Sequence, residues 1–200
     1  RIAQKAHDLF LRYGIRSISM DEIASQLGIS KKTIYQFYAD KDALVDSAID
    51  IVISTNTTEC CVHREESENP VHEILVATDM VQEMLKTMNP TIMYDLQKYH
   101  PVAYKKIADH KNEFLYKLIK GNLEQGIAAQ LYRPEISIEI LSRFRLASVF
   151  MMFSPDLYPL GKYNLGAVIE EVTIHFLYGI TTARGQKLVQ KYLLKRQKNH

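Results

Sequence analysis

The chain has 200 residues, of which 46% are hydrophobic and 24% are charged, and its formal net charge at pH 7 is +2. This length allows a small domain joined to a larger one, with enough apolar side chains to fill a core. The small net charge excludes a surface coated with DNA-binding charge, and the lack of an apolar run of about 18 residues predicts that the chain does not span a membrane. No secretory signal opens the sequence, so we expect a cytoplasmic protein.

Apolar side chains at helical spacing predict a first helix over residues 1–13, with Gly14 as its end signal. A second helix is predicted to begin directly after Ser19, because Ser19 and Glu22 have the spacing of a capping box. Gly28 supplies the left-handed residue that ends this helix after about two turns. The chain therefore predicts two short elements that lead into a tight turn.

A short third helix follows the turn, with Ser30 as its predicted cap. Asp40 is then placed to cap a fourth helix, which begins at Lys41 and continues toward Cys60 as a long connector. A polar loop is predicted over residues 64–69. The second and third helices together predict a helix-turn-helix.

The exposed face of the third helix suits the major groove of DNA. A short helix entering that groove needs hydrogen-bond donors at its leading end and small or flat side chains along its outer face. We expect Lys32 and Gln36 to reach base edges, and most of the others to contact phosphates. The predicted DNA-binding residues are Ser19, Ser30, Lys31, Lys32, Thr33, Tyr35, Gln36, Phe37 and Lys41. The alternative interpretation is the solvated face of an ordinary helical bundle.

Positive charge is concentrated around this segment. Residues 1–41 hold seven Lys and Arg against four Asp and Glu, a net charge of +3. The segment 59–73 is acidic instead. We therefore expect the N-terminal part to face DNA and the acidic segment to face away from it.

Beyond the polar loop, apolar positions at helical spacing predict helices and no convincing strand, so the fold class is all-α. The predicted helices run from Pro70 to the stop at Asn89, and over residues 91–99, 102–108, 111–129, about 135–153, 165–180 and 183 to about 195.

The helices at about 135–153 and 165–180 are apolar on more than one side and must be covered from two directions. This pattern predicts either a thick monomer core or a subunit interface. Arg143 and Arg145 stand out on the first of them. Either arginine pairs with Glu170 or Glu171, or one of them meets an anionic ligand.

Methionine and aromatic residues gather around the irregular central region. Methionine adapts to irregular shapes and tyrosine adds a polar group to an apolar wall, which suits a cavity for a small apolar or amphipathic molecule. The alternative is that these side chains only pack the core. The predicted ligand-binding residues are Met84, Met88, Met93, Tyr94, Tyr99, Tyr104, Phe114, Phe144 and Met151.

No catalytic signature is present, so we assign no catalytic residue, no cofactor and no metal site, and we expect that the chain is not an enzyme. The two cysteines, Cys60 and Cys61, are neighbours, which leaves a thiol or metal sensor as one alternative function. A helical small-molecule carrier or enzyme, in which the N-terminal helices only pack, is another.

The segment from Ile23 to Leu44 resembles the DNA-binding domain of the TetR/AcrR family of bacterial transcriptional regulators. The matching positions are Ile23, Ala24, Gly28, Ile29, Ser30, Lys31, Thr33, Ile34, Tyr35, Tyr38, Lys41 and Leu44. Lys32, Gln36 and Phe37 depart from the family pattern on the face that would touch bases.

The resemblance implies a DNA-binding domain over residues 1–46 and an effector-binding and dimerisation domain over residues 47–200. It further implies a ligand-responsive repressor that binds a pseudo-palindromic operator. The partners would be double-stranded DNA, a small apolar or amphipathic effector, and a second copy of the chain joined through the helices at about 135–153 and 165–180.

Overall fold

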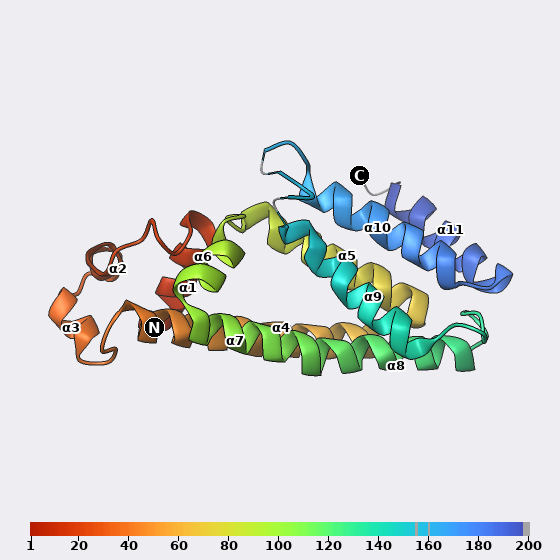
Figure 1. Cartoon of the computed structure of the whole chain (residues 1–200), viewed down its shortest axis with the longest axis horizontal. Helices are drawn as coiled ribbons and strands as arrows, with labels where there is room; N and C mark the ends of the chain where they lie inside the picture. The colour runs from red at the N-terminus through yellow and green to blue at the C-terminus, as the bar shows by residue number, and fades with distance from the viewer. Residues whose placement is uncertain (155, 160, 198–200) are drawn as a thin grey trace. The chain divides into compact units, whose positions relative to one another are not determined.

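A computed structural model describes residues 1–154, 156–159 and 161–197 (Figure 1). In the described residues every regular element is a helix, and Tyr132 and Thr181 form an isolated β-bridge. The all-α prediction is confirmed. The α-helices are α1 (Ile2–Tyr13), α2 (Met20–Leu27), α3 (Lys31–Tyr35), α4 (Lys41–Glu66), α5 (Pro70–Thr87), α6 (Ile92–Tyr99), α7 (Pro101–His110), α8 (Tyr116–Ala128), α9 (Ile138–Phe150), α10 (Leu165–Ile180) and α11 (Ala183–Gln197). A π-helix, η1 (Lys111–Leu115), and a 3₁₀ helix, η2 (Met151–Phe153), complete them.

The chain divides into two compact units. The N-terminal unit comprises residues 1–59 and 84–112, and the C-terminal unit comprises residues 60–83 and those from Glu113 onward. α4 and α5 each contribute residues to both. These two units are defined by which residues pack together. The functional division at residue 46 stays a prediction. Among the described residues, none of the helices combines the length and apolar character that crossing a bilayer requires.

The core of the N-terminal unit forms where α1, α2, α3 and the start of α4 meet. Ile23, Ile34 and Leu44 are fully buried there, and Phe10 of α1 is 4% exposed. Burying a side chain of this size stabilises the folded state by about 1.5–3 kcal/mol. These contacts hold α3 against the other helices of the domain.

α6 and α7 also belong to the N-terminal unit and are tied to α4 by charge. Lys106 of α7 donates to Asp46 at 2.8 Å and to Asp50 at 2.7 Å. His100, just before α7, places its Nδ1 2.7 Å from Asp42 Oδ1. The first half of α4 therefore has α6 and α7 as neighbours as well as the helix-turn-helix.

The C-terminal unit has a separate apolar core, built from α5, α8, α10 and α11. Its buried residues include Val71, Leu123 and Leu177. Tyr132 is 1% exposed and crosses α8 at Gly126, where an added Cβ would lie 1.9 Å from the tyrosine ring. A glycine is required at that position because any side chain would overlap the ring.

Several predicted boundaries differ from the structure. The expected polar loop at residues 64–69 is shorter, because α4 continues to Glu66. Residues 101–128 are helical throughout, because the π-helix η1 joins α7 to α8 where a break was expected. The helix expected at about 135–153 begins at Ile138 and changes to 3₁₀ geometry at Met151.

The capping box of α2 generates a stability prediction. Replacing Ser19 with alanine removes the side-chain acceptor for a backbone N–H at the helix start. We expect this change to lower the free energy of unfolding by about 1 kcal/mol, measured by urea denaturation without DNA. Ser25→Ala is the matched control, since Ser25 is exposed within the same helix, where alanine is the better helix former by a few tenths of a kcal/mol. Equal effects of the two changes would contradict the role of the cap.

Candidate nucleic-acid interface

The turn between α2 and α3 is fixed by local hydrogen bonds. The Glu22 N–H donates to Ser19 Oγ at 3.1 Å, and the Ser19 N–H donates to Glu22 Oε2 at 3.1 Å, which completes the predicted capping box. Gly28 ends α2 in the left-handed conformation, with φ 66° and ψ 31°. A residue with a Cβ would be strained there, so glycine is what allows the chain to turn this tightly.

α3 is capped at its start and held on its inner side, and a second cap begins the helix that follows it. Ser30 Oγ accepts from the Thr33 N–H at 3.1 Å, and Asp40 Oδ1 accepts from the Ala43 N–H at 2.8 Å as α4 begins. Ile34 is 0% exposed and anchors the short helix to the core. The opposite side chains of α3 must therefore face outward.

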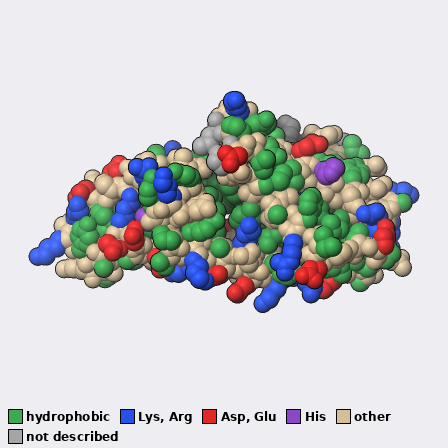
Figure 2. Space-filling view, viewed as in Figure 1, with side chains coloured by type: hydrophobic (Ala, Val, Ile, Leu, Met, Phe, Trp, Pro, Cys, Tyr) green, Lys and Arg blue, Asp and Glu red, His purple; other side chains and the backbone are tan. Residues whose placement is uncertain are grey.

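Most of the predicted DNA-binding residues lie on that outer face or at its edges. The exposed members are Ser19, Ser30, Lys31, Lys32, Tyr35, Gln36 and Phe37, whereas Thr33 and Lys41 are half-buried. Phe37 is 69% exposed and Tyr35 is 46% exposed, which is unusual for aromatic rings in a monomer. Figure 2 shows basic side chains projecting at the α3 end of the molecule.

The two adjacent lysines differ in their surroundings. Lys31 Nζ donates to Asp21 Oδ2 at 2.7 Å, and this hydrogen bond raises the pKa of the lysine. Lys32 forms no ion pair with any described residue. Its full charge is available to a nucleic acid, whereas Lys31 must exchange one anionic partner for another.

Lys41 has an additional contact that the sequence did not indicate. Its Nζ donates to the backbone carbonyl of Ile15 at 2.6 Å and lies 5.8 Å from the Phe10 ring centroid. Partial burial lowers the pKa of Lys41. The side chain thus links the start of α4 to the segment between α1 and α2, and its phosphate contact stays a prediction.

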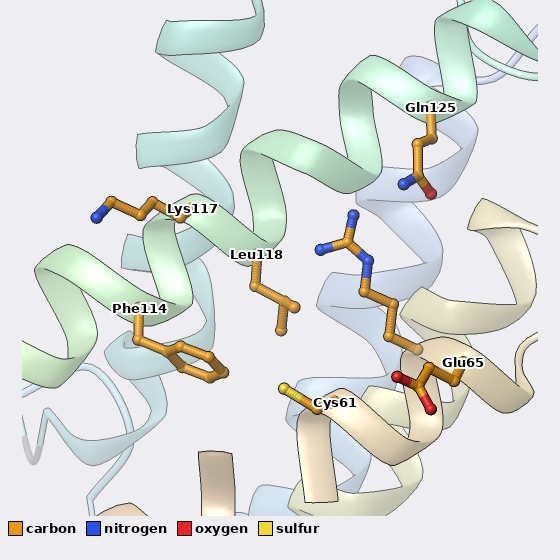
Figure 3. Close-up of a pocket in the computed structure, with 7 residues that line it drawn as sticks. Cys61, Glu65, Phe114, Lys117, Leu118 and Gln125 are labelled. Carbon is orange, nitrogen blue, oxygen red and sulfur yellow. The ribbon is translucent and has the colours of Figure 1, made fainter. Parts of the chain in front are cut away.

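The C-terminal unit contains an open pocket of about 480 Å³ between α4 and the η1–α8 segment (Figure 3). Phe114 and Leu118 point from that segment toward Cys61 on α4. Its lining residues are Cys61, Arg64, Glu65, Phe114, Lys117, Leu118 and Gln125. The lining combines the apolar side chains of Phe114 and Leu118 with charged side chains of both signs.

The nine predicted ligand-binding residues are distributed over both units. Met88, Met93 and Tyr104 pack against the core of the N-terminal unit, while Met84, Tyr94 and Tyr99 of that unit are exposed. Phe114, Phe144 and Met151 belong to the C-terminal unit, and of the nine it is Phe114 that lines the pocket. The Arg16 guanidinium lies 4.8 Å from the Tyr99 ring, which gives that aromatic a packing role. The ligand role of the set stays a prediction.

The thiol and metal alternatives depend on two neighbouring cysteines. Cys60 is half-buried and Cys61 is exposed, both on α4, and they do not form a disulfide. No group of three or more His, Cys, Asp or Glu in the described part of the chain is arranged to hold a metal ion.

A capped helix, a glycine turn and a short outward-facing helix with donors at its leading end define the helix-turn-helix class of DNA-binding proteins. Residues 2–48 match the family of bacterial regulatory proteins described as the tetR family. The chain is 24% identical over 169 residues to the HTH-type transcriptional regulator YvaF of Bacillus subtilis, covering 82% of this chain and 86% of that protein. It is a DNA-binding transcriptional regulator whose N-terminal residues 2–48 match the tetR family.

Solved structures support the fold across the chain. A TetR-family transcriptional regulator from Agrobacterium tumefaciens has a TM-score of 0.74 at 16% identity, with 90% of this chain and 96% of that chain covered. A putative transcriptional regulator from Saccharomonospora viridis, solved in complex with choline, has a TM-score of 0.70 at 14% identity, with 90% and 96% covered. At these identities the likeness shows the fold alone.

Replacing Tyr35 with phenylalanine tests the predicted phosphate contacts. The change removes one hydroxyl donor and keeps the ring. We expect about 5- to 10-fold weaker binding to the preferred duplex and to a scrambled duplex alike, because phosphate contacts carry no sequence information. Fluorescence anisotropy at two salt concentrations measures both affinities, with a preferred duplex selected from a random pool by the wild-type protein.

Gln36→Ala is the contrasting variant, and we expect it to reduce the preference between the two duplexes. Lys187→Ala, an exposed change on α11, is a control that should leave both affinities unchanged. Loss of preference in Tyr35→Phe alone would contradict the assigned roles.

Proposed function

We propose that this regulator is a ligand-responsive repressor that binds a pseudo-palindromic operator as a homodimer. The DNA-binding class rests on the helix-turn-helix and the family. The dimer, the effector and the direction of control are proposals. The main observation in support of the dimer comes from the side chains of α9.

α9 exposes two large apolar side chains and buries two polar ones, which is unusual for a helix on the surface of a monomer. Ile140 is 66% exposed and Phe144 is 52% exposed, whereas Ser142 and Arg145 are 0% and 6% exposed. The outer face of neighbouring α10 adds Tyr178, which is 38% exposed. Exposed large apolar side chains such as Ile140 and Phe144 favour a face that a second subunit covers. The helices are those for which the sequence predicted an interface.

A dimer gives the helix-turn-helix a geometric requirement. Two α3 helices reach successive major grooves when they lie about 34–36 Å apart along the DNA, or a multiple of that distance. An effector that binds more tightly to a conformation with another separation would lower the affinity for the operator. The difference between the effector's affinities for the two conformations limits the size of this decrease. We propose that the effector binds in the C-terminal unit.

The comparison structures leave the effector's chemistry open. Choline, bound by the Saccharomonospora viridis protein, is a cation, but at 14% identity its ligand does not transfer to this chain. The open pocket beside Cys61 has a volume within the usual range for small-molecule sites, about 300–1,000 Å³. We propose no catalytic role for this pocket.

Replacing Ile140 with glutamate tests the dimer. A carboxylate placed on an apolar subunit interface must lose hydration without gaining a partner, at a cost of several kcal/mol. We expect the change to weaken self-association at least 30-fold, measured by sedimentation equilibrium, and to abolish high-affinity operator binding. Val102→Glu is the matched control, because Val102 is equally exposed at 68% but lies on α7. Unchanged self-association of Ile140→Glu would refute the proposed interface.

A further inference from the structure

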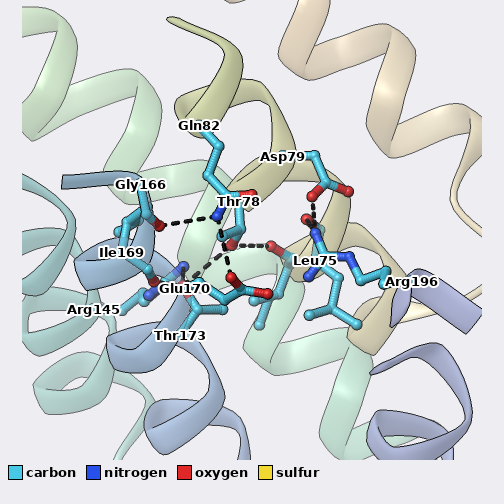
Figure 4. Close-up of polar contacts among 11 residues, drawn as sticks. Leu75, Thr78, Asp79, Gln82, Arg145, Gly166, Ile169, Glu170, Thr173 and Arg196 are labelled. Carbon is cyan, nitrogen blue, oxygen red and sulfur yellow. Dashed lines mark hydrogen bonds and ion pairs between the residues drawn. The ribbon is translucent and has the colours of Figure 1, made fainter. Parts of the chain in front are cut away.

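Arg145 is a buried cation in the C-terminal unit. Its side chain extends from α9 toward α10, where Nη2 donates to Thr173 Oγ1 at 2.9 Å (Figure 4). The guanidinium carbon lies 5.4 Å from the ring centroid of Phe176. The residue is 6% exposed, so water does not solvate this charge to any useful extent.

The second terminal nitrogen of this guanidinium has no partner. Arg145 Nη1 is buried and makes no hydrogen bond, and no ion pair among the described residues includes Arg145. The expected pairing with Glu170 or Glu171 is not formed, and Arg143 pairs instead with Glu139 of its own helix at 3.6 Å. In the same unit, Arg196 does have a carboxylate partner, Asp79.

The groups around Arg145 are neutral. Thr173 donates its single hydroxyl proton to the Ile169 carbonyl at 2.7 Å, so towards Arg145 it is an acceptor without charge. Thr78 Oγ1 lies 3.2 Å from Thr173 Oγ1 and donates to the Ile74 carbonyl at 2.8 Å. Burial holds the pKa of Tyr132 well above its ordinary value, so this phenol is neutral at pH 7.

The nearby carboxylate of Glu170 has a different partner. Its Oε2 lies 3.5 Å from Gln82 Nε2, which also donates to the Gly166 carbonyl at 2.9 Å (Figure 4). This contact joins α5 to α10 and leaves the positive charge of Arg145 uncompensated. Glu170 therefore does not supply the missing negative charge.

An uncompensated buried cation is costly. Burial lowers the pKa of Arg145 to about 10, so the side chain keeps its proton at pH 7 and remains charged. Removing such an ion from water without a partner costs several kcal/mol, which an arriving anion offsets through a charge-assisted hydrogen bond. The free Nη1 donor is where that bond would form.

We infer that Arg145 receives the carboxylate of the effector, a small amphipathic monoanion whose apolar body lies beside Phe176. This assignment rests on the proposed function and specifies its ligand. A single cation surrounded by neutral hydroxyls and an aromatic ring matches one negative charge. A doubly charged phosphate would require a second cation beside it.

Matched pairs of an acid and its uncharged amide test the assignment. The probes are octanoate with octanamide, and 4-phenylbutyrate with 4-phenylbutyramide, added to the full-length protein at neutral pH. At a ligand concentration about tenfold above Kd, we expect at least one acid to raise Tm by roughly 3–5 °C and its amide to leave Tm unchanged. Equal responses to acid and amide, or no response to either acid, would overturn the assignment.

Arg145→Met identifies the residue, with Arg143→Met as its control. Arg143 is exposed on the same helix and lies against the Tyr116 ring. We expect Arg145→Met to abolish the response to the acid and Arg143→Met to keep it. Retention of the response in Arg145→Met would overturn the assignment, and the wild-type comparison of acid with amide decides the matter if this variant does not fold.

A measurement without ligand separates this role from a structural one. Because the guanidinium is uncompensated, replacing it with an apolar side chain of similar length should leave Tm unchanged or raise it in the ligand-free protein. A purely structural arginine would lose stability on the same change. A lower Tm of folded Arg145→Met without ligand would therefore count against the assignment.

DNA binding distinguishes failure of this inference from failure of the proposed function. If the acid binds through Arg145 but operator affinity is unchanged by it, the assignment holds and ligand-responsive control fails. If the protein binds its operator but does not distinguish acid from amide, the assignment fails and the DNA-binding function is untouched. Loss of operator binding on adding the acid supports both.

Discussion

The burial of Ile34 is the contact on which the DNA-binding surface depends. α3 has five residues, and a helix of that length has almost no stability of its own in water. Ile34 is 0% exposed, so the core shared by α1, α2 and α4 holds this helix and fixes which of its sides faces solvent. The cap at Ser30 and the left-handed Gly28 determine the approach of the chain, but they cannot replace that burial. Lys32 and Tyr35 are presented outward because the opposite side of the helix is fixed.

Local sequence signals predicted the elements of this domain, and tertiary contacts decided what they could not. The capping box at Ser19, the turn at Gly28 and the caps at Ser30 and Asp40 were identifiable because each depends on neighbours within three residues. The resemblance supplied the class and the family, which the lysines alone could not distinguish from a solvated helix face. The bond from Lys41 to the Ile15 carbonyl joins residues 26 positions apart, so no local pattern indicates it. The predicted ligand residues were chosen by side-chain type, which does not determine the unit to which each belongs.

Electrostatics in the DNA-binding domain depend on position more than on total charge. With a net charge of +2 for the whole chain, attraction to DNA must come from a few well-placed cations. Lys31 is already paired with Asp21, and Lys41 is half-buried on a backbone carbonyl. Lys32 is left as the exposed cation of α3 without an ion-pair partner among the described residues. A protein with this arrangement should show a modest salt dependence, with uncharged donors such as Tyr35 contributing to phosphate contacts and Gln36 to base preference.

The side chains of α9 link the two proposals for the C-terminal unit. A monomer gains stability by exposing Ser142 and Arg145 and burying Ile140 and Phe144, and the structure has the reverse arrangement. The exposed apolar side is stabilised if a second subunit covers it, and the buried guanidinium is stabilised if an anion reaches it. Both faces belong to a helix of 13 residues. An anion that moves Arg145 therefore moves the backbone that carries Ile140 and Phe144, because side chains on opposite sides of one helix share its hydrogen-bonded frame. If both proposals hold, ligand charge and subunit packing would be coupled through this single helix.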